Sequence, residues 1–305
     1  IAGPLKLHGV RFADAALGVE ATVEAIAIDL ALLELIGMRV HVTQAEIGGL
    51  DVLLSEPSVP AAPPEPSEPF DMQAPIDLIV ERFMLRDAVV RRVDATLVKL
   101  DSLALDASWI GRDATVKRLD VRSPDGQVQF AGSASRRAAY RGEGNGQFDW
   151  QVGETRYRGT LEVRAPNDEV AATLALAAPL RATVNIDLVQ QAQWPWKFAL
   201  DVPAFDPRES LLPESDWESL AATLQGSGTL QRGTVQGEIV LNGVPLRFEQ
   251  LAYERVDERI DVLAKALLGG GTFDVAGWIV PNAEPANAKI EAKWSSLTLP
   301  QEWLG

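Results

Sequence analysis

Apolar and polar residues alternate along most of the chain. In the stretches 170–176, 182–188 and 196–202 every second residue is apolar, and the residues between them are small or polar. Because successive side chains of a β-strand point to opposite faces, a period of two predicts strands with one apolar and one polar face. No helical segment separates the three stretches, so they predict consecutive antiparallel strands. The expected fold class is all-β, a long antiparallel meander with a few short helices.

The same pattern, with its interruptions, divides the chain into four segments. Residues 1–54 predict strands around a short helix at residues 30–36, which Gly37 is expected to cap, and a bend at Gly48-Gly49. Residues 55–74 form a proline-rich loop that cannot enter the interior of a sheet. Residues 75–204 and 205–305 are two further β segments. In the last segment a short helix is predicted around residues 216–220, and the segment is expected to continue beyond residue 305.

Composition and charge exclude several classes of function. The 305 residues carry a formal net charge of −15 and contain no long basic run, which argues against a nucleic-acid partner. The absence of cysteine excludes disulfides and thiolate metal sites, and it fits an oxidising compartment. No run of about 18 apolar residues is present that could span a membrane as a helix. Because the chain begins without methionine, we expect it to be part of a longer protein whose signal or anchor lies outside it.

No group of residues has the pattern of a catalytic site or a cofactor site. The nucleophile-elbow, paired-histidine zinc and phosphate-loop motifs are missing. The two histidines, His8 and His41, lie in strand patterns, where a hydrogen-bonded or exposed histidine is commoner than a metal ligand. The glycine-rich residues 142–146 lack the helix that follows a dinucleotide-binding loop. We therefore expect a protein that is not an enzyme and that uses no cofactor and no metal.

The apolar face of the predicted sheet needs a covering, and the pattern leaves two alternatives open. The sheet could fold against itself as a sandwich or closed barrel, which hides the apolar residues in a core. It could instead curl into an open groove that holds an apolar ligand. Helices do not supply the covering, because the sequence predicts only two or three short ones. Composition and periodicity alone favour the sandwich, because closed all-β cores are common. The unbroken succession of strands, interrupted by short helices and glycine bends, leans toward the groove, since very large open sheets curl or split.

Two sets of residues resemble a known family. Gly9-Val-Arg-Phe12 and residues 25–33 and 47–53 are similar to the membrane-proximal start of TamB-type proteins, in the AsmA-like, bridge-like lipid transfer group. In that family a strand, a short helix and a second strand precede a proline-rich loop. Residues 205–212, the turn containing Trp217 and residues 224–246 resemble the repeating segment of the same family. The similarity covers most of the chain and consists of loose patterns of strand and glycine.

The resemblance implies a β-taco, a long sheet curled into an open U-shaped groove in the periplasm. It implies a conduit that carries phospholipid acyl chains between the inner and outer membranes, as part of a translocation and assembly module. The expected partners are phospholipids, an outer-membrane TamA-like protein reached through a distal region outside this chain, and the inner membrane through an anchor outside it. The alternative function is a β scaffold, or chaperone, that assists outer-membrane protein assembly by pairing its edge strand with client strands.

Alternation allows the residues of the two faces to be named. Polar residues expected to face water are Thr183, Asn185, Asp187, Lys197 and Lys289. The residues expected to line the lipid groove are Val184, Ile186, Leu188, Trp196, Phe198, Leu200, Phe273, Val275, Ile279 and Ile290.

Overall fold

The computed structural model describes residues 4–14, 16, 18–55, 72–136, 139–209, 214–281 and 287–298. Of these residues, 77% lie in β-strands and 3% in helices, which confirms the predicted all-β class. No described helix combines the length and the apolar composition that a bilayer span requires. Residues 56–71, which include the prolines of the predicted loop, lie outside the described residues.

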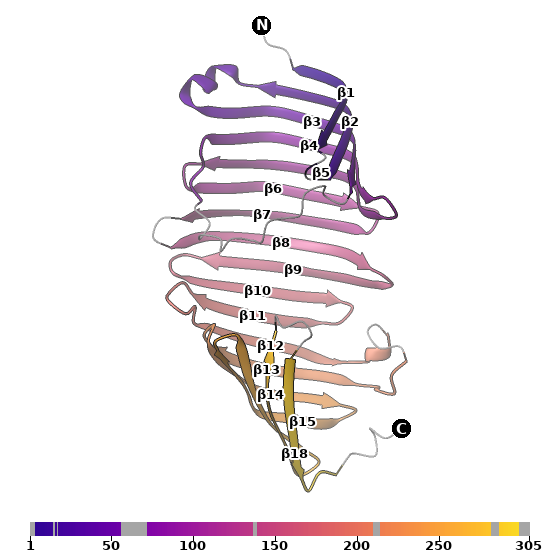
Figure 1. Ribbon diagram of the computed structural model, residues 1–305, viewed down its shortest axis with the longest axis vertical. Coiled ribbons are helices and arrows are strands. Elements are labelled where there is room, and N and C mark those ends of the chain that lie inside the picture. The colour runs from indigo at the N-terminus through magenta and orange to yellow at the C-terminus, as the bar shows by residue number, and fades with distance from the viewer. Residues whose placement is uncertain are drawn as a thin grey trace. The chain divides into compact units, whose positions relative to one another are not determined.

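The chain divides into two compact units, residues 1–152 and 153–305. The described part of the first unit contains these strands (Figure 1): β1 (Leu5–Asp14), β2 (Val19–Leu30), β3 (Arg39–Leu54), β4 (Asp77–Arg92), β5 (Thr96–Ile110), β6 (Asp113–Ser123), β7 (Gly126–Arg136) and β8 (Tyr140–Val152). The described part of the second unit contains these strands: β9 (Thr155–Ala165), β10 (Glu169–Ala178), β11 (Ala182–Val189), β12 (Trp196–Phe205), β13 (Leu220–Gly228), β14 (Arg232–Leu241), β15 (Val244–Val256), β16 (Arg259–Leu268), β17 (Gly271–Val280) and β18 (Asn287–Ser295). The four segments predicted from the sequence stay a prediction.

Within each unit every strand pairs with the next one along the chain, and the pairs are antiparallel except for one. The exception is β3 with β4, which are parallel. Parallel neighbours need a crossover of a dozen or more residues, and the long connection between Leu54 and Asp77 supplies it. Over the described residues, the first and last strands of a unit do not pair with each other, so each sheet is open. The predicted open meander is therefore confirmed.

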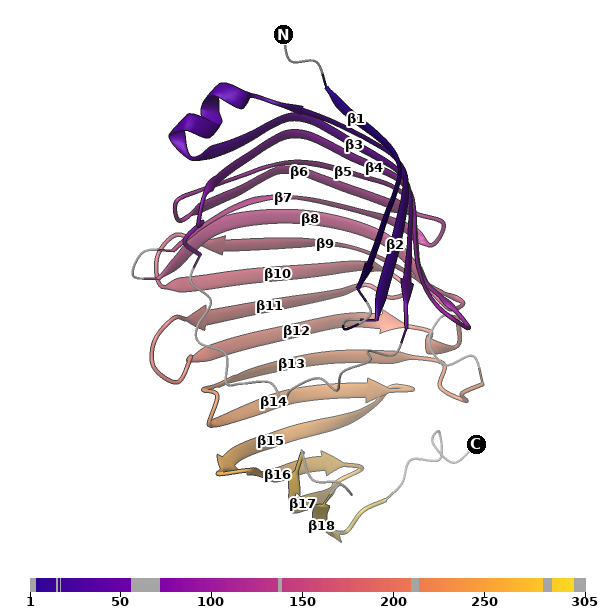
Figure 2. The same cartoon turned by 45° about the horizontal axis from the view of Figure 1, so that its top comes forward.

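The sheet of the first unit bends along a line of residues in register across β1 to β5, which are Gly9, Glu24, Gly49, Asp87 and Asp101. The φ angles of Gly9, Gly49 and Asp87 are +63°, +64° and +54°. At this line the apolar alternation of each strand changes phase by one residue, while the register between the strands continues without a shift. Figure 2 shows the same strands turning sharply partway along their length. The bend predicted at Gly48-Gly49 is thus part of a crease that crosses five strands.

The short helix predicted at residues 30–36 is present in altered form. It is a 3-10 helix, η1 (Leu32–Gly37), between β2 and β3. The residue in the left-handed conformation that ends it is Met38, with φ 56° and ψ 36°. The predicted Gly37 cap is therefore wrong.

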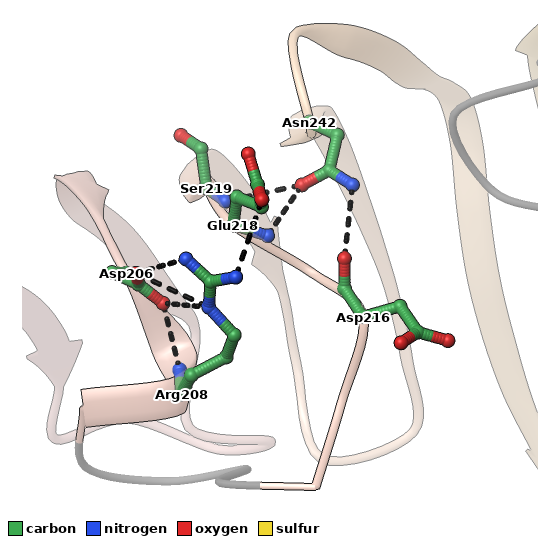
Figure 3. Close-up of polar contacts among 6 residues, drawn as sticks. All are labelled: Asp206, Arg208, Asp216, Glu218, Ser219 and Asn242. Carbon is green, nitrogen blue, oxygen red and sulfur yellow. Dashed lines mark hydrogen bonds and ion pairs between the residues drawn. The ribbon is translucent and has the colours of Figure 1, made fainter. Parts of the chain in front are cut away.

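The helix predicted around residues 216–220 is also wrong, because tertiary contacts hold this loop (Figure 3). Asn242 Oδ1 accepts the backbone N–H groups of Glu218, at 2.7 Å, and Ser219, at 3.1 Å. The guanidinium of Arg208 donates to both carboxylate oxygens of Asp206 and, at 3.2 Å, to Glu218. The segment is thus tied to the turn between β14 and β15, and the helical turn lies earlier, in the 3-10 helix η2 (Pro207–Glu209).

Few described side chains are fully buried, and they are small. Most buried apolar residues are alanines, and the largest side chain that is completely buried is that of Pro207. A sandwich would enclose large apolar side chains between two packed layers. In this protein large apolar side chains stay partly exposed along the strands. The structure therefore rejects the closed sandwich and leaves the apolar face open.

Candidate functional site

The ten residues predicted to line a groove all lie on one face of the sheet of the second unit. Directly opposite residues of an antiparallel pair point to the same side. On β11 and β12 the opposing pairs are Val184 with Leu200, Ile186 with Phe198 and Leu188 with Trp196. On β16 to β18 the corresponding pairs are Ala266 with Phe273, Ala264 with Val275, Ile260 with Ile279 and Gly277 with Ile290.

Strands β13 to β15 join these two groups into one apolar surface, which we call the trough face. Leu224 and Gly226 lie opposite Leu200 and Phe198, and Val235 continues the row on β14. On β15 two residues separate Phe248 from Leu251, and register shifts occur on both sides of this interval. These bulges keep both side chains on the trough face. The ten residues share one face in this register, and their role as the lining of a lipid groove stays a prediction.

The trough face is covered at one end of its strands and open at the other. At the covered end Ala182, Val202 and Ala222 form a buried cluster, against which Leu200 and Phe205 pack. Towards the opposite end and the later strands the exposed fraction rises. It is 38% for Ile186, 39% for Ile279 and 70% for Ile290. The open part of the face is partly exposed, whereas the covered part is ordinary core.

Aromatic rings lie flat over glycines on the trough face. A Cβ on Gly226 would come within 2.6 Å of the Phe198 ring, and one on Gly233 would lie 2.6 Å from Trp196 and 2.7 Å from Tyr253. Covering of strand glycines by neighbouring aromatic rings stabilises sheets. The glycines thus create a broad, smooth aromatic surface at this end of the trough.

Hydrogen bonds hold two of these rings in place. The rings of Trp196 and Tyr253 are stacked, with centroids 6.5 Å apart and planes at 4°. Trp196 Nε1 donates to the carbonyl of Thr229 at 3.1 Å, and the Tyr253 hydroxyl donates to the same carbonyl at 2.6 Å. The sequence prediction named Trp196 and Phe198 but missed Tyr253. Tyr253 could have been found from its position opposite Gly233 in the strand register. Alternation alone does not reveal which residues lie opposite each other.

The opposite face of the same strands is polar, as predicted. Thr183, Asn185 and Asp187 alternate with the trough residues of β11, and Asp187 lies opposite Lys197. Asn185 Oδ1 accepts a hydrogen bond from the Thr173 hydroxyl at 2.9 Å. On β18, Lys289 pairs with Glu291 at 2.8 Å, an arrangement that raises the pKa of Lys289 and lowers that of Glu291.

A hollow of about 760 Å³ lies beside the open end of the strands. Leu188 and Trp196 contribute to its lining, together with the cationic residues Arg164, Lys197 and Arg232. Apolar and cationic side chains therefore meet at this end of the sheet.

One of the two histidines, His41, is hydrogen-bonded to carboxylates from two other elements. His41 Nδ1 lies 2.7 Å from Glu34 Oε1, and Nε2 lies 3.0 Å from Glu81 Oε1. The hydrogen bond with Glu34, followed by that with Glu81, raises the pKa of His41, and the same contact lowers the pKa of Glu34. His41 thus ties η1 to β3 and β4, which confirms the hydrogen-bonded setting expected for it. Within the described ranges, no cluster of three His, Asp or Glu side chains is arranged to hold a metal ion.

Residues 2–134 match a protein family described as TamB, N-terminal domain. This match supports a TamB-type protein. It agrees with the resemblance seen in residues 9–53, whereas residues 205–246 lie outside the matched range. A search of curated proteins and a search of solved structures each returned no match.

The match to the TamB N-terminal domain supports a role in the translocation and assembly module, in which TamB-type proteins work with TamA in the periplasm. It is a transport and assembly family that is not known to be enzymatic. The match covers β1 to β6 and most of β7, all in the first unit of this TamB-type chain. The trough residues lie in the second unit, so their role has to be argued from geometry.

Proposed function

We propose that the trough face is a conduit that carries phospholipid acyl chains along this TamB-type protein. The observation that carries the proposal is one open apolar face, continuous in register from β9 to β18. With strands about 4.8 Å apart, ten strands extend roughly 45 Å across the sheet. A tail lying on this face can pass from strand to strand without leaving an apolar surface.

The energetics favour such a surface for lipid transfer through water. Exposing acyl chains costs about 0.8 kcal/mol per CH₂, on the order of 20 kcal/mol for a lipid with two tails. A partly exposed face of valine, leucine, isoleucine and aromatic side chains recovers much of that free energy and leaves the headgroup in water. No charged side chain needs to contact the tails, because charged residues of β11 and β12 alternate onto the other face.

Site-specific photo-crosslinking with phospholipid tests the conduit. A benzophenone amino acid at position 186 or 198 is on the trough face, whereas one at position 185 or 197 is on the polar face of the same strands. We expect positions 186 and 198 to capture phospholipid and positions 185 and 197 to remain uncoupled. Equal capture on both faces, or none at positions 186 and 198, would contradict the proposal.

A second candidate function is a scaffold that pairs with client β-strands, and the edge strand β18 favours it. All nine residues of β18 are exposed, including Ile290 at 70% and Trp294 at 66%. Within the described residues β18 pairs with β17 and with no other strand. A crosslinker at Lys293 that captures strand peptides of an outer-membrane protein, with none captured at position 186, would favour this function over the conduit.

A further inference from the structure

The turn between β2 and β3 carries a second apolar surface, separate from the trough face. We call residues 32–38 the apolar tip. The exposed fractions are 84% for Leu33, 85% for Ile36 and 68% for Met38, and Leu32 and Leu35 are half-exposed. The helix η1 packs on β3. Isolated exposed apolar residues are common, but a contiguous group of this kind marks an interaction site.

The single charge of the tip is paired within the chain. Glu34 is the acidic residue of η1, and its Oε1 lies 2.7 Å from His41 Nδ1. Its other oxygen lies 3.7 Å from the guanidinium of Arg39, which also approaches Asp77 at 3.6 Å. The side chains of Glu34 and Arg39 are 37% and 43% exposed, and that of His41 is 16% exposed. The carboxylate is thus partly exposed but neutralised by its partners, and the most exposed side chains of the tip are apolar.

The backbone at the tip is held in an unfavourable conformation. Met38 has φ 56° and ψ 36°, in the left-handed region that disfavours residues with a side chain. Its N–H donates to the carbonyl of Leu35 at 3.1 Å, which closes the turn. Strained residues persist where the surrounding structure holds them and where the conformation serves an interaction.

The size and chemistry of the tip select its partner. A stable protein interface uses about 20–30 residues on each side, with polar groups at its rim. The tip offers seven consecutive residues at the end of a hairpin, and its one charged side chain is already paired with His41 and Arg39. A bilayer requires neither area nor complementary charges, because the affinity follows the apolar surface that enters the headgroup boundary. We propose that the apolar tip inserts into the surface of a phospholipid bilayer.

This attachment goes beyond the conduit and does not depend on it. The tip belongs to the first unit, whereas the trough residues lie in the second. Failure of one proposal therefore leaves the other standing, since lipid capture at position 186 and bilayer binding by residues 32–38 are measured separately.

Insertion is tested with a fluorophore, for which the absence of native cysteine is an advantage. Ile36→Cys, labelled with an environment-sensitive nitrobenzoxadiazole dye, is mixed with phosphatidylcholine vesicles. The control is Val93→Cys with the same label, at a residue that is 83% exposed in the turn between β4 and β5. We expect the emission to rise at position 36 and to stay constant at position 93. Equal responses at the two positions, or no response at position 36, would overturn the proposal.

Flotation with the same vesicles measures how much of the binding depends on the tip. The double variant Leu33→Glu and Ile36→Glu should bind at least tenfold less than the unmodified chain, because two apolar side chains no longer enter the bilayer. Val93→Glu should bind as the unmodified chain does, and raised salt should leave binding unchanged, since no ion pairs are involved. Undiminished binding by the double variant would refute insertion. If light scattering shows instead that the unmodified chain self-associates through residues 33 and 36, the tip is a contact between copies and the bilayer proposal fails.

Discussion

The same substitution placed at the two ends of the trough face distinguishes an open surface from a closed core. Ile186→Asp changes a residue that is 38% exposed, on the open part of the face. Val202→Asp changes a residue that is 9% exposed, inside the cluster with Ala182 and Ala222. Both side chains point to the same side of the sheet, on neighbouring strands. The comparison of the two variants therefore changes how far the position is buried and keeps the introduced side chain the same.

The expected free energies of unfolding differ by several kcal/mol. At position 186 the variant loses only the partial burial of an isoleucine, about 1–2 kcal/mol, because the new carboxylate reaches water. At position 202 the carboxylate has no partner in the buried cluster, and burying a polar group without one adds a desolvation cost of several kcal/mol. The sum reaches about 4 kcal/mol or more, a large share of the stability of a typical domain.

Urea denaturation followed by tryptophan fluorescence measures both variants, and circular dichroism verifies that each is folded in the absence of urea. We expect a small shift of the midpoint for Ile186→Asp and a large one for Val202→Asp. The Ile186→Asp variant should in addition lose lipid capture at position 198, since tails would have to pass a charge. If Ile186→Asp destabilises the chain as much as Val202→Asp does, the open trough face is refuted.

Two further predictions concern packing and charge. Gly233→Ala places a methyl group 2.6 and 2.7 Å from the edges of two stacked aromatic rings, so it should cost about 1–3 kcal/mol in urea denaturation. Gly48→Ala, whose Cβ meets nothing within 4 Å, should be close to neutral, and equal costs for the two would contradict the ring-over-glycine packing. Because the pKa of His41 is raised from 6.5 by its two carboxylate partners, the protonated ring stabilises the fold below pH 6.5, and this stabilisation is lost as the pH rises through the raised value. His41→Ala should therefore lower the Tm at pH 5.5 more than at pH 9, and a difference independent of pH would argue against the paired histidine.

The sequence by itself determined the strands and the two faces of the sheet. Alternation is a local property, because a period of two assigns each side chain to a face regardless of the strand's neighbours. For this reason Val184 and Ile290, far apart in the chain, were both assigned to the trough face before their strands were placed. The bend at Gly48-Gly49 was likewise local, since a glycine accepts the positive φ that the turn of the strand requires.

Local patterns misjudged the two positions where tertiary contacts outweigh propensity. The segment 216–220 has helix-forming residues, but the amide of Asn242 accepts its backbone N–H groups and holds it as a loop. Gly37 is the residue type expected to end the helix, yet the residue in the left-handed conformation is Met38. Met38 lies next to the network of Glu34 and His41. At residues 216–220 the deciding side chain lies in the turn between β14 and β15, and its distance in sequence hides it from any local pattern.

Only the tertiary structure decided what covers the apolar face. A sandwich and an open groove have the same alternation of apolar and polar residues. The alternation shows which side of the strand is apolar, but it carries no information on what packs against that side. The parallel pairing of β3 with β4, the buried cluster at Val202 and the rings over Gly233 all depend on which strands become neighbours. The contacts between strands leave one end of this face as buried core and the other partly exposed.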